Sequence, residues 1–158
     1  MTDYPKLLST LVGGGVRFII VGGAAATAHG SVRLTVDLDV VYDRGGDNVG
    51  RLAAALAPHR PYLRGSPEGL PFRLDEATLR AGLNFTLNTS IGAIDLLGEI
   101  AGGGTYQTLE PDSLPMTLFG HECRVLGLAR LIEVKRAAGR PKDLEAIAEL
   151  EALRDMNR

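Results

Sequence analysis

The chain has no tryptophan, four phenylalanines, four tyrosines and one cysteine among its 158 residues. The single cysteine excludes an intrachain disulfide. Cys123 lies in a short apolar run, so we predict a buried structural thiol rather than a catalytic one. The shortage of aromatic residues argues against a stacking platform for single-stranded nucleic acid.

A strong net charge and a long apolar run are also missing. The formal net charge is −2 at pH 7, so any attraction for an anion has to be local. The most apolar window, residues 18–28, is shorter than the roughly 20 residues of a membrane-spanning helix. The N-terminus lacks the basic and apolar regions of a signal peptide. We therefore predict a cytoplasmic protein that does not bind membranes.

Glycine, in contrast, is abundant. Twenty glycines and a hydrophobic content of 45% suit a turn-rich fold with an aliphatic core. The length is about that of one domain, and the chain has no internal repeat, low-complexity segment or long linker. We predict one α+β domain that spans residues 1–158.

The spacing of apolar residues predicts helices and strands along the whole chain. The predicted helices cover residues 4–12, 22–28, 48–56, 75–80 and 106–109, with two more that begin after Gly127 and at Pro141. The predicted strands cover residues 16–21, 35–42 and 62–63, with hairpins at 83–87/91–97 and 114–118/122–126. Gly139 stands where a glycine ends a helix, and Pro141 stands where a proline begins one.

Two aspartates, Asp37 and Asp39, occupy alternate positions of the predicted strand 35–42. Side chains alternate along a strand, so both carboxylates project to the same face. Such a pair can share one or two Mg²⁺ ions, which prefer oxygen ligands. The alternative is a solvated pair on an exposed face, but the flanking valines indicate a buried strand, where aspartate is rare. We therefore favour a metal site.

A third carboxylate, Asp95, lies in the apolar strand 91–97. If that strand neighbours Asp37 and Asp39, Asp95 reaches the same cation. Taken alone, Asp95 is equally compatible with a hydrogen-bonded structural role. Glu99 is a weaker candidate for the same face.

The pair Gly22-Gly23 joins a predicted strand to a predicted helix. Glycines allow a ligand to approach the backbone, and the N–H groups at a helix start attract phosphate. No Walker or Rossmann pattern is present, so a tight turn without a ligand is the alternative. Arg33 and Thr35 could steer a phosphate or order the loop.

The densest basic cluster lies between the last two predicted helices. Lys135, Arg136 and Arg140 could face a triphosphate across a cleft. The alternative is that these residues only stabilise a helix C-terminus. Lys135 shares a helical face with apolar residues, and an inward-directed lysine indicates a functional role.

Together these segments resemble the nucleotidyltransferase superfamily with the DNA polymerase β-like core, and more narrowly the small bacterial AbiEii-type toxins and related proteins. The resemblance covers residues 16 to 150. Its motifs are Phe18-Ile19-Ile20-Val21-Gly22-Gly23-Ala24-Ala25-Ala26, His29-Gly30-Ser31-Val32-Arg33-Leu34-Thr35-Val36-Asp37-Leu38-Asp39, Gly92-Ala93-Ile94-Asp95-Leu96-Leu97 and Leu131-Ile132-Glu133-Val134-Lys135-Arg136-Ala137-Ala138-Gly139-Arg140-Pro141-Lys142-Asp143.

The resemblance implies a mixed sheet flanked by helices, followed by C-terminal helices. It also implies roles for the residues that match its motifs. Gly22 and Gly23 would hold a triphosphate, Asp37 and Asp39 would bind Mg²⁺, Asp95 would complete the metal site, and Lys135 and Asp143 would take part in activity. One departure concerns Ala24, which stands where many members have a phosphate-binding serine.

The resulting hypothesis is a Mg²⁺- or Mn²⁺-dependent nucleotidyltransferase. It would move a nucleoside monophosphate from a nucleoside triphosphate (NTP) to a hydroxyl of RNA, tRNA or protein. The resemblance also implies a toxin–antitoxin component with a cognate partner protein. Two alternatives remain: a catalytically degenerate partner-binding module and a purely structural cation site.

Overall fold

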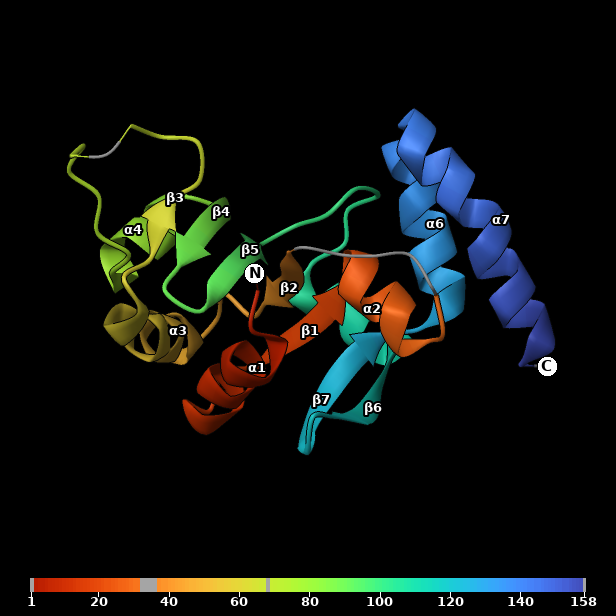
Figure 1. Cartoon of the computed structure of the whole chain (residues 1–158), viewed down its shortest axis with the longest axis horizontal. Coiled ribbons are helices and arrows are strands. Elements are labelled where there is room, and N and C mark those ends of the chain that lie inside the picture. The colour runs from red at the N-terminus through yellow and green to blue at the C-terminus, as the bar shows by residue number, and fades with distance from the viewer. Residues whose placement is uncertain (1, 32–36, 68, 158) are drawn as a thin grey trace.

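The computed structural model describes residues 2–31, 37–67 and 69–157. Its centre is a seven-stranded mixed sheet with the strand order β3-β4-β5-β2-β1-β7-β6 (Figure 1). The strands are β1 (Phe18–Val21), β2 (Leu38–Tyr42), β3 (Tyr62–Leu63), β4 (Asn84–Thr89), β5 (Gly92–Leu97), β6 (Ser113–Leu118) and β7 (His121–Leu126).

Helices flank this sheet. They are α1 (Tyr4–Gly13), α2 (Gly22–Ala28), α3 (Asn48–Leu56), α4 (Glu76–Ala81), α5 (Tyr106–Leu109), α6 (Leu128–Ala138) and α7 (Pro141–Met156), with 3₁₀ turns at Ala57–His59 and Glu110–Asp112. The last two helices pack together at one end of the molecule, beside α2 (Figure 1). Among the described helices, none is both long enough and apolar enough to cross a membrane.

The core is aliphatic and centres on β1 and β2. All four residues of β1 are buried, as expected for a continuous apolar strand covered on both faces. Strand β1 runs antiparallel to β2 and parallel to β7, and β2 runs parallel to β5. Cys123 is buried in β7, where burial raises the pKa of its thiol, so the predicted burial is confirmed.

Local sequence signals locate several elements to the residue. Helices α2, α3 and α5 have the predicted bounds, and β3 lies at the predicted residues. Asp75 caps α4 by accepting a hydrogen bond from the backbone N–H of Thr78 at 2.8 Å. Gly139 ends α6 with φ +66°, a left-handed conformation that glycine adopts without strain, and α7 begins at Pro141 as predicted.

Several predicted strand bounds are wrong in detail: β4 runs two residues further than predicted, and β5, β6 and β7 each begin one residue away from the prediction. Strand β1 begins at Phe18, two residues later than predicted. Asp37 lies in a bend before β2 rather than inside a strand. The pairing explains this, because the first residue of β2 with a partner in β5 is Leu38, opposite Ile94, and β1 ends opposite Asp39. Residues 35–36 of the predicted strand lie outside the described residues.

Candidate functional site

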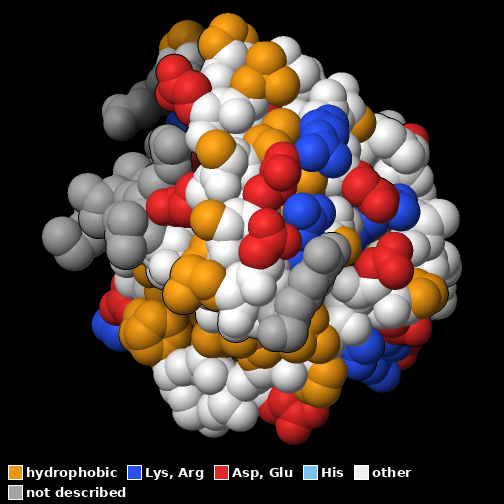
Figure 2. Space-filling model, turned by 90° about the vertical axis from the view of Figure 1, so that its right-hand side faces the viewer, with side chains coloured by type: hydrophobic (Ala, Val, Ile, Leu, Met, Phe, Trp, Pro, Cys, Tyr) orange, Lys and Arg blue, Asp and Glu red, His pale blue; other side chains and the backbone are white. Residues whose placement is uncertain are grey.

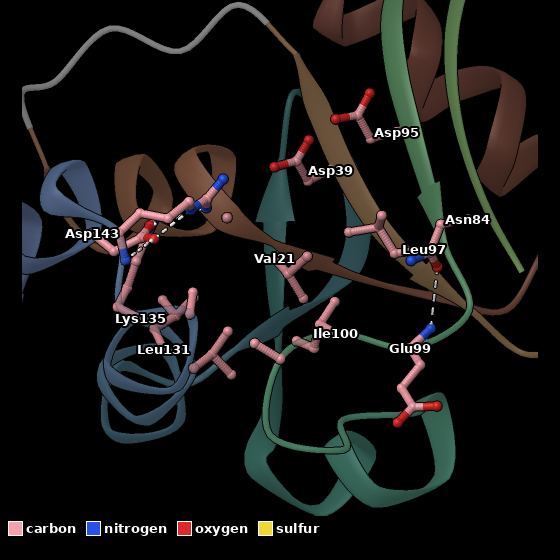
Figure 3. Close-up of a pocket in the computed structure, with 15 residues that line it drawn as sticks. Val21, Asp39, Asn84, Asp95, Leu97, Glu99, Ile100, Leu131, Lys135 and Asp143 are labelled. Atoms are coloured by element: carbon pink, nitrogen blue, oxygen red, sulfur yellow. Dashed lines mark hydrogen bonds and ion pairs between the residues drawn. The ribbon is translucent and has the colours of Figure 1, made fainter.

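Three carboxylates converge where β2 and β5 lie side by side. Asp39 is the register partner of Asp95 across this parallel pair, and Asp37 precedes β2 by one residue. Each of the three offers an oxygen that lies within 4.8 Å of the other two. Asp39 and Asp95 stand next to each other in Figure 3. The structure therefore brings together the three carboxylates that the sequence predicts as metal ligands.

One inner carboxylate oxygen lacks a hydrogen-bond donor. Within the described part of the chain, the buried Asp39 Oδ1 accepts no hydrogen bond, whereas the buried Asp95 Oδ1 lies 2.9 Å from Arg64 Nη2. Burial first, and then the neighbouring Asp95 and Asp37, together raise the pKa of Asp39 to about 7, with Lys135 acting in the opposite direction. A buried oxygen without a donor, clustered with two further carboxylates, suits a hard cation such as Mg²⁺ or Mn²⁺. The residues present therefore fit a divalent metal.

Gly22 makes room for this cluster. Its φ of +62° is in the left-handed region, and a Cβ added there would overlap Asp39 Oδ2. The strand-to-helix turn from β1 into α2 thus packs its backbone directly against the carboxylate. Gly23, the next residue, lines a neighbouring polar cavity.

Cationic side chains face the carboxylates from α6 and α7. Lys135 Nζ lies 3.2 Å from Asp143 Oδ1, and Arg140 Nε lies 2.6 Å from Asp143 Oδ2. Asp143 is fully buried; burial alone would raise its pKa, but hydrogen bonds from Arg140 and Lys135 outweigh burial and lower it. An ionised Asp143 therefore fixes both cations at the site.

Two cavities adjoin the carboxylates, and Asp39, Asp95, Lys135 and Arg140 line both. The first, of about 380 Å³, is mainly polar and is also lined by Gly23, Ala26, Ser31, Asp37, Lys142, Ala146, Glu149 and Leu150. The second, of about 340 Å³, has both polar and apolar walls and appears in Figure 3; its other lining residues include Gly22, Asn84, Leu97, Glu99, Ile100, Leu131, Val134 and Asp143.

Some predicted site residues do not lie beside the three carboxylates. Arg136 lines neither cavity, and its Nη2 pairs with Glu151 Oε1 of α7 at 2.8 Å. Glu99 lines the second cavity, but its carboxylate points away from Asp39 and Asp95 in Figure 3. Arg33 and Thr35 lie outside the described residues.

Acidic and basic side chains are intermixed on the side of the molecule that carries α6 and α7 (Figure 2). The basic side chains form no single large patch on this face. This mixture agrees with the net charge of −2 and keeps the attraction for anions local to the cavities.

Arg64 is a site residue that the sequence did not reveal. It follows β3 in a segment rich in proline, glycine and arginine. Its guanidinium lies 3.2 Å from Asp37 Oδ2 and 2.9 Å from Asp95 Oδ1. No local pattern distinguishes Arg64 from the other arginines nearby, because the pairing of β3 with β4 brings it to the site.

Comparisons with known proteins bear on the fold. No protein-family model matches the chain, and no curated protein matches its sequence. The crystal structure of a "putative nucleotidyltransferase" from Thermotoga maritima superimposes with a TM-score of 0.59 at 14% sequence identity, over 91% of this chain and 87% of that one. This likeness confirms the predicted fold class, a mixed sheet flanked by helices, which the chain shares with that protein. The narrower AbiEii-type assignment stays a prediction.

Proposed function

We propose that the protein is a divalent-metal-dependent nucleotidyltransferase that moves a nucleoside monophosphate from an NTP to an acceptor hydroxyl. One observation carries the proposal: three carboxylates converge opposite Lys135 and Arg140. The fold shared with the Thermotoga maritima protein is compatible with this activity. Fold alone does not define chemistry, so the residues of the site have to support it.

Asp37, Asp39 and Asp95 would hold the metal. Bound there, Mg²⁺ or Mn²⁺ would neutralise phosphate charge and lower the pKa of the attacking hydroxyl. Among the described residues, no donor reaches the buried Asp39 Oδ1, so a cation would stabilise this oxygen most.

The polar cavity is our assignment for the triphosphate. Lys135, Arg140 and Lys142 supply positive charge around it, and Gly23 exposes backbone on the side of α2. Asp143 orients Lys135 and Arg140 before a ligand arrives, which reduces the entropy lost on binding. We assign Asp143 a positioning role. Contacts of the phosphates with Gly22, Arg33, Thr35 and Arg136 stay predictions.

The acceptor would enter from the second cavity, the one drawn in Figure 3. Its hydroxyl oxygen forms a bond to the α-phosphorus while the bond from that phosphorus to pyrophosphate breaks. Pyrophosphate then leaves on the side of the cations. The hydroxyl proton passes to Asp95, which lines this cavity.

NTP binding and turnover test the proposal. ATP, CTP, GTP and UTP are titrated with Mg²⁺ into the protein, and release of labelled pyrophosphate is measured with and without cell extract. We expect binding of at least one NTP and its loss in the double variant Asp37→Ala/Asp39→Ala. The double variant Asp47→Ala/Asp155→Ala removes the same charge at exposed positions and should bind normally. Binding that is unchanged by loss of Asp37 and Asp39 would sink the proposal.

Identification of the acceptor needs a second experiment. The protein is incubated with α-labelled NTP and cell extract, and the labelled species is separated into RNA, tRNA, protein and small molecules. Transfer to one class, absent in Asp39→Asn, would identify the acceptor class.

A non-catalytic partner-binding role is the second candidate, and Ala24 favours it because alanine offers no hydroxyl to a phosphate. A toxin–antitoxin role with a cognate partner belongs with this candidate and stays a prediction. Co-purification of a stoichiometric protein partner, together with no turnover of any NTP, would favour it over transfer.

A further inference from the structure

Arg64 binds two of the three carboxylates assigned to the metal. Its Nη1 lies 3.2 Å from Asp37 Oδ2, and its Nη2 lies 2.9 Å from Asp95 Oδ1. Its side chain is 29% exposed, so the ion pairs are partly shielded from solvent. A guanidinium therefore lies beside oxygens that a divalent ion would use.

The position of this guanidinium is built into the sheet. Arg64 Nη2 donates to the carbonyl oxygen of Leu87 at 2.7 Å, and Nε donates to Asn88 Oδ1 at 3.1 Å. The backbone N–H of Arg64 donates to the carbonyl oxygen of Thr86 at 2.9 Å. Every nitrogen of the guanidinium thus has a partner, and β4 aims the side chain at the cluster. A surface arginine in a chance ion pair would lack these supports.

The guanidinium of Arg64 compensates the negative charges of the three carboxylates unevenly. The guanidinium serves Asp37 and Asp95, whereas Asp39 Oδ1 accepts no hydrogen bond from any described residue. Three clustered carboxylates repel one another unless a cation lies between them. Arg64 supplies part of that positive charge from within the chain, and it does so at two of the three side chains that would bind a metal.

We propose that Arg64 is an internal counter-cation that competes with divalent metal for Asp37 and Asp95. This inference rests on the metal site of the proposed function. Arg64 keeps the carboxylates together in the metal-free protein and weakens their affinity for a free ion. A metal ion that takes Asp37 Oδ2 or Asp95 Oδ1 as a ligand displaces Arg64 from that oxygen.

Direct metal binding tests this role without any assay of activity. Free Mn²⁺ is measured by its electron paramagnetic resonance signal during titration of the protein, in the absence of nucleotide. Arg64→Met removes the charge and keeps an unbranched side chain. We expect it to bind Mn²⁺ about tenfold more tightly than the wild type, because two partly exposed ion pairs no longer compete.

Three further variants sharpen the measurement. Arg51→Met removes an arginine that pairs with Asp47 instead, and it should bind Mn²⁺ like the wild type. Arg64→Lys retains the charge without the planar fork that reaches two carboxylates, so an intermediate affinity is expected. Arg64→Gln retains donors for Leu87 and serves if Arg64→Met fails to fold, with the same tightening expected.

The outcomes separate this inference from the function on which it rests. If Mn²⁺ binds in the wild type and Asp39→Asn abolishes it, the metal site stands. In that case an unchanged or weaker affinity in Arg64→Met and Arg64→Gln overturns the role of Arg64 alone. Mn²⁺ binding that is absent in all variants, or retained in Asp39→Asn, overturns the inference together with the metal site.

Discussion

Two aspartates four residues apart, Asp39 in β2 and Asp43 just after it, have opposite environments. Asp43 accepts hydrogen bonds from Arg17 Nε at 2.9 Å, from the backbone N–H of Gly45 at 2.8 Å and from Gln107 Nε2 at 2.9 Å. Burial would raise the pKa of Asp43, but these bonds outweigh burial and lower it. Asp39 has a raised pKa because burial and other carboxylates surround it.

The difference shows that a carboxylate near the start of β2 and another just after its end can have different roles, one at the candidate site and one in the structure. Donors from the chain satisfy Asp43, so its charge stabilises the fold. No described residue donates a hydrogen bond to Asp39 Oδ1, which leaves this oxygen available to a metal cation. The predictions below test whether Asp43 has a structural role and Asp39 a role in metal binding and catalysis.

The largest expected effect is on catalysis. Asp39→Asn should lower the rate of nucleotide transfer by about 10²–10³-fold, because a transition-state charge loses its stabilisation. Asp43→Asn should leave the rate per folded molecule within about threefold of the wild type, since Asp43 lines neither cavity. Initial rates of labelled pyrophosphate release at saturating NTP measure both. Equal losses in the two variants would contradict the comparison.

The next effect concerns the backbone that packs on Asp39. Gly22→Ala should lower the free energy of unfolding by about 3 kcal/mol, because alanine is strained at φ +62° and its Cβ overlaps the carboxylate. Gly13→Ala is the matched control, since a Cβ there has no neighbour within 4 Å and φ is not positive. Urea denaturation followed by circular dichroism measures both, and equal stability of the two variants would refute this role of Gly22.

Replacement of Asp43 tests its contribution to the stability of the fold. Asp43→Asn should lower the free energy of unfolding by about 2 kcal/mol, because the charged hydrogen bonds with Arg17 and its neighbours are lost. Asp39→Asn in the absence of metal should be at least as stable as the wild type, because a repelling charge disappears. Chemical denaturation in EDTA gives both values. A stabilised Asp43→Asn variant would reverse our interpretation.

The last expected effect is a pH dependence of stability. Between its ordinary pKa near 3.8 and its folded-state pKa of about 7, Asp39 is protonated in the folded chain and ionised in the unfolded chain. The free energy of unfolding of the metal-free protein should therefore fall as pH rises through this interval. The lowered pKa of Asp43 acts with the opposite sign, since its contribution is lost only as pH falls. Denaturation from pH 4 to 8 should show a shallower fall in Asp39→Asn; an identical profile would contradict the assignment.

Much of the fold could be predicted because its signals are local. The change from the apolar residues of β1 to Gly22 locates a strand end and a helix start within a few residues. Gly139 and Pro141 likewise locate the junction of α6 and α7. The start of β2 was harder to predict, because it depends on which residues of β1 and β5 lie opposite it.

The site was predictable only in part. The sequence singled out Asp37, Asp39 and Asp95 as carboxylates in or beside apolar strands, and it singled out Lys135 on an apolar helix face. It could not distinguish Arg136, which pairs with Glu151, from Arg140, which lines both cavities. Nor could it indicate Arg64, whose position depends on strand pairing across more than twenty residues of chain.

By itself the sequence determined the elements, the aliphatic core and the residue types available for chemistry, because these follow from the periodicity of neighbouring residues and from composition. Only the tertiary structure decided which charges meet. Register across β2 and β5 brought Asp39 to Asp95, whereas the contacts of Arg17, Gly45 and Gln107 satisfied Asp43. The charge state of a carboxylate depends on groups within a few ångströms in space, and residues distant in the sequence supply most of those groups.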